Sequence, residues 1–390
     1  MLVSMESDRV FVAEKDAQIL ELERQISALQ KSISSLRSAK HIPQKRLDAY
    51  KYPVLTLPNE IISEIFLHFL PPYPDYPPFI GRLSPFLLTH ICHLWREIAI
   101  ATPKLWRTIA HTQWYPYVNF VPLTALYLER ARGCPLSVHR AESHGGFPSL
   151  IPYRSRWEHV KLYRVYNWPL MLAGPMPRLR TLHILDVPPV PQPSPIVFTL
   201  EHAPLLRILD MPILDAAHLP KLPWGQLTSL TLQTVRLHQL VSILEQSPDL
   251  MELRCFIHYC SDFILPPSGI PSLHRLTRLS LDYHTPPKDR NFLNSFTVPA
   301  LKTLEVPHSL LGKEPIESIK RFMAKSSCQI TELRVIRAEL PASSYKKEIP
   351  SITNIVCERR PRWDWLMIAD FLKQFVLASS QENISNEVLD

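Results

Sequence analysis

Apolar and polar positions alternate along the chain with three different periods, and the first stretch predicts a long helix. Apolar side chains between residues 19 and 36 follow each other at steps of three and four, which places them on one stripe of period 3.5. The stripe consists of Ile19, Leu22, Ile26, Leu29, Ile33 and Leu36. Isoleucine at every a position and leucine at every d position favour a parallel two-stranded coiled coil. Two interpretations stay open, a homodimer and a helix that folds back on the rest of the chain.

The second stretch, residues 55–108, predicts a small helical unit. Helical spacing between Asn59 and Leu70 predicts an amphipathic helix, which Pro71 and Pro72 end. A proline-rich loop follows, and the spacing after it predicts two short helices that meet near His90. Three helices in about fifty residues form a marginal core. We therefore expect this unit to bury part of its surface on a partner or on the next domain.

The third stretch repeats the pattern Leu-x-x-Leu-x-Leu eight times in a degenerate form. Its copies begin at Trp157, Leu179, Leu206, Leu227, Leu250, Leu276, Leu301 and Ile330, which are 21 to 29 residues apart. This period is similar to that of leucine-rich repeats, and each copy predicts one strand of a parallel stack. Helical spacing at residues 237–244 and 316–323 predicts helices between strands. The fold class is therefore α/β, an irregular leucine-rich-repeat solenoid over residues 151–345.

Within each copy, the residue between the last two apolar positions faces away from the apolar column. These residues are the predicted target-binding set His183, Asp210, Thr231, Arg254, Ser280, Glu305 and Arg334. We expect them to be exposed, beside a second column of Thr181, Ile208, Ser229, Glu252, Arg278, Thr303 and Glu332. Mixed charges and hydroxyls suit recognition of a polar protein surface. The alternative is an ordinary solvated strand face.

Residues 55–106 resemble the F-box family. That family opens with Leu-Pro and a glutamate two residues on, and its last helix carries an apolar-Cys-basic-x-Trp-basic stretch, an apolar pair and a Pro-x-Leu-Trp ending. The opening is matched by Leu57, Pro58, Glu60, Ile61, Ile65 and Phe66, and the rest by Ile91, Cys92, Trp95, Arg96, Ile98, Ala99, Pro103, Leu105 and Trp106. The chain departs from the family at His93, where Arg or Lys is usual, and in its longer proline-rich loop.

The resemblance implies docking to the S-phase-kinase-associated-type linker subunit of a cullin-RING ubiquitin ligase. It assigns linker-subunit binding to Leu57, Pro58, Glu60, Ile61, Ile65 and Trp95. An apolar patch on so small a unit needs an outside protein to cover it. The alternative is that some of these side chains, Trp95 above all, fill the three-helix core.

Composition and charge narrow the function further. Lys and Arg exceed Asp and Glu by 43 to 36 but form no run of five or six, so we expect no nucleic-acid partner. The chain has 39 prolines and only 8 glycines, and it carries no glycine-rich phosphate loop, zinc-protease or nucleophile motif. We therefore expect no enzyme and no cofactor. The best metal pattern, Cys255-x-x-His258-x-Cys260, lacks a second ligand pair, so we expect no metal.

Cysteine spacing and hydropathy bear on location. The six cysteines are scattered without a paired framework, which indicates a reducing compartment. No apolar run is long enough to span a bilayer, and the N-terminus does not resemble a signal peptide, so we expect a soluble cytoplasmic or nuclear protein without a membrane partner. The prolines between 188 and 195 predict a surface connector, with a polyproline ligand as the alternative.

These patterns predict six segments. They are a coiled-coil-like helix (1–42) ended by Pro43, a linker (43–54), an F-box unit (55–108), a connecting segment (109–150), the repeat domain (151–345) and a C-terminal capping helix and tail (346–390). The capping helix is predicted from Trp365, Leu366, Ala369, Leu372, Phe375 and Val376. The predicted function is that of a substrate-recognition adaptor of an SCF-type ligase. The alternative is an F-box scaffold without a role in ubiquitination.

Overall fold

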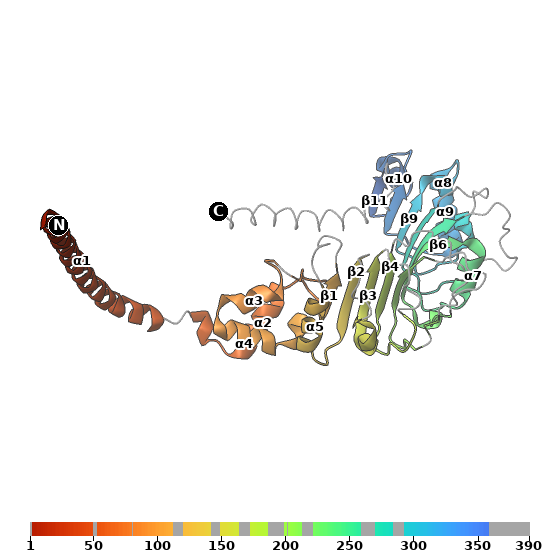
Figure 1. The fold of residues 1–390 in the computed structure, drawn as a ribbon. Coiled ribbons are helices and arrows are strands. Elements are labelled where there is room, and N and C mark those ends of the chain that lie inside the picture. The colour runs from red at the N-terminus through yellow and green to blue at the C-terminus, as the bar shows by residue number, and fades with distance from the viewer. Residues whose placement is uncertain are drawn as a thin grey trace. The chain divides into compact units, whose positions relative to one another are not determined.

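The chain has a long N-terminal helix and a mixed α/β part built on one parallel sheet, in a computed structural model (Figure 1). The structure describes residues 2–49, 53–79, 81–111, 120–141, 149–163, 172–185, 199–200, 202–212, 221–258, 270–283 and 292–358. The chain divides into two compact units, Met1–Ile62 and Ser63–Asp390.

The N-terminal helix α1 runs from Leu2 to Ala49 and has Pro43 inside it. The prediction that Pro43 ends the helix was therefore wrong, and so was a linker beginning at residue 43. The φ angle that the proline ring imposes is compatible with a helix, and the cost is one backbone hydrogen bond and crowding of the preceding turn. Residues 44–47, Gln-Lys-Arg-Leu, are good helix formers that allow the helix to continue. A short 3₁₀ helix, η1 (Pro53–Thr56), follows.

The three helices predicted between residues 55 and 106 are present. They are α2 (Asn59–Phe69), α3 (Pro85–Ile91) and α4 (His93–Ala101), and a 3₁₀ turn, η2 (Pro103–Trp106), follows them. The hydroxyl of Ser84 caps α3 by accepting the Phe86 N–H at 3.2 Å. The extended backbone of Cys92 separates α3 from α4, two residues beyond the predicted junction at His90.

An eleven-stranded parallel sheet follows, and each strand pairs with the next one in the chain. The eight predicted strands are all confirmed, as β3 (Trp157–Tyr163), β4 (Thr181–Leu185), β5 (Ile208–Met211), β6 (Ser229–Arg236), β7 (Glu252–His258), β8 (Arg278–Tyr283), β9 (Thr303–Pro307) and β10 (Glu332–Ile336). Neighbouring apolar columns form the core: Leu182, Leu209 and Leu279, for example, are fully buried. The leucine period therefore sets the register of the strands.

Three further strands extend the sheet beyond residues 151–345, the predicted repeat domain. They are β1 (Thr108–His111) and β2 (Leu136–Ala141) at one edge and β11 (Asn354–Glu358) at the other. Residues 109–150 are thus more than a connecting segment, because β1, helix α5 (Phe120–Arg130) and β2 lie there. Residues 352–357, Ile-x-x-Ile-x-Cys, also fit the repeat pattern and would have predicted β11.

Helices connect several of the strands. The predicted helices are confirmed as α7 (Leu237–Glu245) and α9 (Pro315–Ser326), and shorter helices are α8 (His308–Leu311) and α10 (Ala342–Glu348). Other links contain the 3₁₀ turns η4 (Ile151–Arg156), η5 (Trp224–Gln226) and η6 (Phe292–Ser295). Side chains on α7 and α9, such as Leu240 and Phe322, are completely buried and belong to the core. The predicted capping helix from Trp365 to Val376, the prolines 188–195 and Cys260 lie outside the described residues.

Candidate functional site

Helix α2 carries apolar side chains on two neighbouring sides, one buried and one exposed. Ile62 and Phe66 are buried, with 0% and 1% of their surface exposed. Ile61 and Ile65, one turn apart, are 49% and 43% exposed. Neighbouring residues on a helix are about 100° apart, so the two isoleucines at 61 and 62 can share one wide apolar face or be divided between a core and the surface. Leu57, just before the helix, is also exposed, at 38%.

The six residues predicted to bind the linker subunit fall into two groups. Leu57, Pro58, Glu60, Ile61 and Ile65 are exposed. Trp95 on α4 is half-buried, and its ring meets that of Phe66 edge-on at a centroid distance of 4.9 Å. Trp95 therefore contributes to the packing between α2 and α4. A hydrogen bond between the hydroxyls of Ser63 and Thr102, 3.1 Å apart, also joins α2 to the end of α4.

Three further apolar side chains are exposed on α3 and α4, and helical spacing places the first two of them in the apolar face of these helices. They are Leu87, Ile91 and Ile100, with exposed fractions of 38%, 53% and 37%. Leu88, Ile98 and Ala99 are the members of that face that are buried. Periodicity alone cannot separate the two groups, because an apolar residue at helical spacing can face either a core or a partner.

Trp106, at the end of η2, joins the short helices to the start of the sheet. Its side chain is completely buried, and its indole N–H donates to the carbonyl of Ala99 at 2.8 Å. Its ring lies edge-on to Phe86 of α3 and Tyr127 of α5, at 5.3 and 5.1 Å between centroids. The Arg130 guanidinium lies 4.3 Å from its ring centre. This cluster fixes the position of α3 and α4 relative to β1 and α5.

The proline-rich loop, residues 71–79, contacts the first strands of the sheet. The Tyr73 hydroxyl donates to a carboxylate oxygen of Glu158 at 2.8 Å, and the Tyr73 ring packs on His159 at 5.0 Å. The Arg107 guanidinium lies 3.5 Å from the Tyr73 ring centre. Burial and the bond to Glu158 raise the pKa of Tyr73, so it stays a neutral donor. The loop thus makes a second connection between the helices and the sheet.

A half-buried histidine lies against the same loop. The His139 ring on β2 packs against Tyr76 at a centroid distance of 4.4 Å, and its Nε2 lies 2.9 Å from the Ser137 hydroxyl. That hydroxyl donates to the carbonyl of Pro74 at 3.0 Å, so it accepts from His139, which places the proton on Nε2. Burial, and then the positive charge of Lys161, lower the pKa of His139 to about 3, with smaller effects of His183 and His159.

The low pKa of His139 predicts that the chain loses stability in acid. Its pKa is about 3 when folded against 6.5 when exposed, so only the unfolded chain binds a proton between these values. The contribution of His139 to the free energy of unfolding is fully present above pH 6.5. It is lost as the pH falls toward 3, by at most about 1.4 kcal/mol per pH unit. Urea unfolding between pH 7 and 5 should show a smaller loss for His139→Gln than for the wild type. Equal losses would contradict this role for His139.

All seven predicted target-binding residues lie in one row across the sheet. Strand register pairs each with the next, from His183 and Asp210 at β4 and β5 to Glu305 and Arg334 at β9 and β10. Their exposure is lower than predicted: none of the seven is fully exposed, and five of them are half-buried. Ser280 and Glu305 are buried, with 2% and 9% of their surface exposed. For Glu305 the reason is a neighbouring guanidinium, which compensates its charge.

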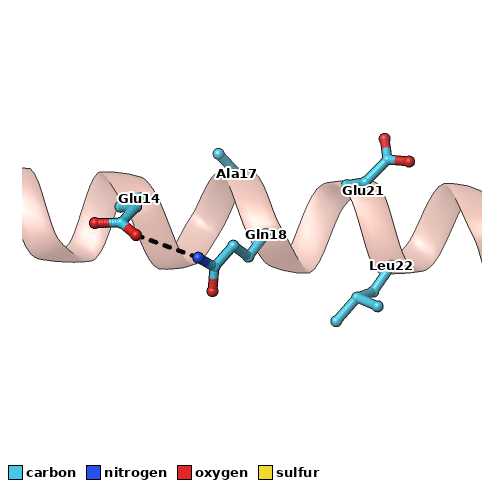
Figure 2. Close-up of a pocket in the computed structure, with 5 residues that line it drawn as sticks. All are labelled: Glu14, Ala17, Gln18, Glu21 and Leu22. Atoms are coloured by element: carbon cyan, nitrogen blue, oxygen red, sulfur yellow. Dashed lines mark hydrogen bonds between the residues drawn. The ribbon is translucent and has the colours of Figure 1, made fainter.

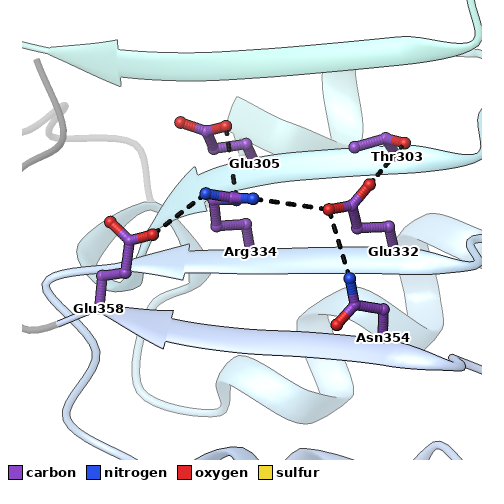
Figure 3. Close-up of polar contacts among 6 residues, drawn as sticks. All are labelled: Thr303, Glu305, Glu332, Arg334, Asn354 and Glu358. Carbon is purple, nitrogen blue, oxygen red and sulfur yellow. Dashed lines mark hydrogen bonds and ion pairs between the residues drawn. The ribbon is translucent and has the colours of Figure 1, made fainter. Parts of the chain in front are cut away.

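That guanidinium belongs to Arg334, which lies among three carboxylates (Figure 3). Its nitrogens are 3.1 Å from Glu358, 3.5 Å from Glu332 and 3.9 Å from Glu305. Glu332 also accepts from Thr303 at 3.4 Å and Asn354 at 3.5 Å. Three carboxylates share one cation here, so this end of the row is acidic. The ion pairs and hydrogen bonds also hold these polar side chains in place.

A second ion pair joins β8 to the residue that follows β10. Asp282 on β8 is completely buried and binds both terminal nitrogens of Arg337, at 3.1 and 3.3 Å. The Asp282 carboxylate also accepts the backbone N–H of Tyr283 at 2.8 Å. Such bidentate pairing, supported by a backbone donor, compensates the burial of a charge. The sequence pattern had no means of identifying this pair, since the two residues are far apart in the chain.

The described residues contain no group of three or more metal-binding side chains. Cys255, from the weak metal pattern, is completely buried, and burial raises the pKa of its thiol. Among the helices of the described part, none has the length and hydropathy needed to cross a membrane. A scan against protein-family models gives no match, and a search of the curated proteins gives none either.

Proposed function

We propose that the chain is a substrate-recognition adaptor of an SCF-type cullin-RING ubiquitin ligase. In this proposal, residues 55–108 are an F-box that docks to the S-phase-kinase-associated-type linker subunit. The sheet is an irregular leucine-rich-repeat solenoid, and its polar row binds a target protein. The chain itself is not an enzyme and carries no cofactor. It holds a target lysine close to a charged conjugating enzyme, so its contribution is proximity and orientation.

The observation that carries this proposal is the outward apolar side of α2. Ile61 and Ile65 stay about half exposed while Ile62 and Phe66 next to them are buried. An apolar residue of this size, repeated one turn apart on a short helix, is the kind of anchor that a partner protein covers. The positions are those at which the F-box resemblance expects contact with the linker subunit.

The polar row supports the second half of the proposal. His183, Asp210 and Arg334 keep 34%, 18% and 20% of their side-chain surface exposed. Fixed donors and acceptors of both charges give specificity for a polar protein surface more than raw affinity. The free thiols of Cys92, Cys134, Cys255, Cys328 and Cys357 support a reducing compartment, and so the cytoplasm or nucleus.

The direct test is a calorimetric titration of the purified linker subunit into the full chain. We expect binding at a one-to-one ratio of chain to linker subunit. A folded chain that does not bind at all would contradict the proposal. The alternative, a scaffold that binds the linker without ubiquitination, is separated by target turnover: proteins captured by the full chain should accumulate in cells when the chain is deleted, and constant levels would favour the scaffold.

A further inference from the structure

Helix α1 carries an apolar stripe that no side chain of its own unit covers. Every described side chain from residue 7 to residue 47 is exposed. The heptad residues are between 48% and 66% exposed: Ile19, Leu22, Ile26, Leu29, Ile33 and Leu36. A helix with a stripe of this kind buries it against another element. We infer that the partner is a second copy of this chain, joined to the first as a parallel two-stranded coiled coil.

The side chains of the stripe select this partner. Isoleucine at a and leucine at d pack best when two parallel helices place a opposite a and d opposite d. The apolar period of 3.5, sustained from residue 19 to 36, matches a supercoiled partner of the same period. Packing of a straight helix on the face of a globular domain has a period of 3.6 and a broader stripe.

Polar groups beside the stripe allow two copies to approach each other. Gln18 and Gln25, at g positions, donate to Glu14 and Glu21 one turn earlier, at 3.2 and 3.1 Å. Arg24 pairs with Glu21 at 2.7 Å on the outer side. In a parallel pair, g positions face the e positions of the other copy, which are Glu23, Gln30 and Arg37. An amide or a hydroxyl then faces each of them, so no like charges meet.

A small hollow on α1 does not suggest a different ligand. Figure 2 shows the five residues that border it, Glu14, Ala17, Gln18, Glu21 and Leu22, all on the one helix. A single helix has no opposite wall and cannot enclose a small molecule. Leu22 points to a different side of the helix from Glu21 (Figure 2). Its side is the one that a second copy would cover.

Dimerisation would make the adaptor bivalent. A coiled coil over residues 19–36 joins two chains and hence two copies of the docking helix and two polar rows. A target that offers two sites then binds the second row at a high effective concentration. This consequence rests on the proposed function, whereas the dimer itself does not.

Sedimentation of the full chain tests the inference. We expect a mass of twice 45.1 kDa at micromolar concentration and dissociation on dilution, because three heptads form a short seam. The variant Ile26→Asp, Leu29→Asp should stay monomeric at all concentrations. Leu20→Asp, at an exposed position outside the stripe, should dimerise like the wild type. A wild-type monomer at every concentration, as a fold-back of α1 would give, overturns the inference, and so does a dimer that tolerates both stripe aspartates.

Cross-linking tests the parallel direction. Leu22→Cys should form an intermolecular disulfide on mild oxidation, because d faces d only in a parallel pair. The wild-type chain, with its own six cysteines, is the control and should not cross-link under the same conditions. A dimer in which Leu22→Cys cross-links only with Ile33→Cys of another chain would show the antiparallel arrangement and overturn the inference. Linker-subunit binding by the stripe variants shows independently whether the proposed function holds.

Discussion

Replacing Ile61 and Ile65 together by lysine should lower the affinity for the linker subunit by at least about 100-fold. Anchor residues of an interface contribute about 2 kcal/mol or more each on truncation, and about 1.4 kcal/mol corresponds to a factor of ten. Lysine also places a charge where the partner is expected to be apolar. The fold should survive, because both side chains are about half exposed and lysine has a good helix propensity. Calorimetric titration with the linker subunit measures the loss.

The matched control is Val121→Lys on α5. Val121 is 46% exposed, close to the values for Ile61 and Ile65, but it lies outside the F-box resemblance. Its replacement should leave the affinity within about twofold of the wild type, as expected for a surface change away from the interface. Thermal unfolding of both variants checks that they are folded. Equal affinities of the double variant and the control would show that α2 does not carry the interface.

The leucine repeat predicted the sheet because its leucine positions are the ones that the strands bury in the core. An apolar residue every second position in a strand fixes which side faces the core, and the recurrence fixes the order of the strands. All eight predicted strands and the two predicted helices between them are present. The strands β1 and β2 were missed because their apolar positions do not complete the pattern: residues 106–111 end in His111.

The candidate sites were only partly predictable, because several of their contacts join residues far apart in the chain. The bond from Tyr73 to Glu158 and the packing of Tyr76 on His139 need the folded sheet. Proline at positions 71–78 indicated a loop but not what the loop contacts. The burial of Glu305 likewise depends on Arg334 on the next strand. A periodic pattern shows which side a residue faces but not how its polar neighbours compensate its charge.

The proline-rich loop is longer than in the F-box family that residues 55–106 resemble, and its residues bond to the sheet. Tyr73 and Pro74 connect the loop to Glu158 and Ser137 on β3 and β2, and Trp106 connects the following helices to α5. These two sets of contacts restrict rotation of the helices against the sheet more than a single covalent connection would. Under the proposed function, which works by proximity, restricted movement of α3 and α4 against the sheet would help to position a target lysine.

Trp106→Ala should therefore destabilise the second unit by about 3 to 5 kcal/mol, the range for removing a buried aromatic ring. The ring is completely buried, and its loss leaves a cavity between Phe86 and Tyr127 and leaves Ala99 without its indole donor. Trp106→Phe should cost less, because it keeps a ring in the cluster and loses mainly the hydrogen bond. Tyr153→Phe, which keeps the ring of a side chain 37% exposed and removes only its hydroxyl, is the control and should change stability by about 0.5 kcal/mol or less. Urea unfolding gives all three values.

The same variants separate a structural role of Trp106 from a direct role in docking. Because the side chain is completely buried, a partner cannot reach it, so Trp106→Phe should bind the linker subunit with wild-type affinity under conditions in which it is folded. Target ubiquitination should nevertheless fall, since a looser cluster at Phe86, Tyr127 and Arg130 lets the helices move relative to the polar row. A loss of linker binding in the folded Trp106→Phe chain would place this residue in the interface. A Trp106→Ala cost below about 1.5 kcal/mol would show that the cluster does not hold the two parts together.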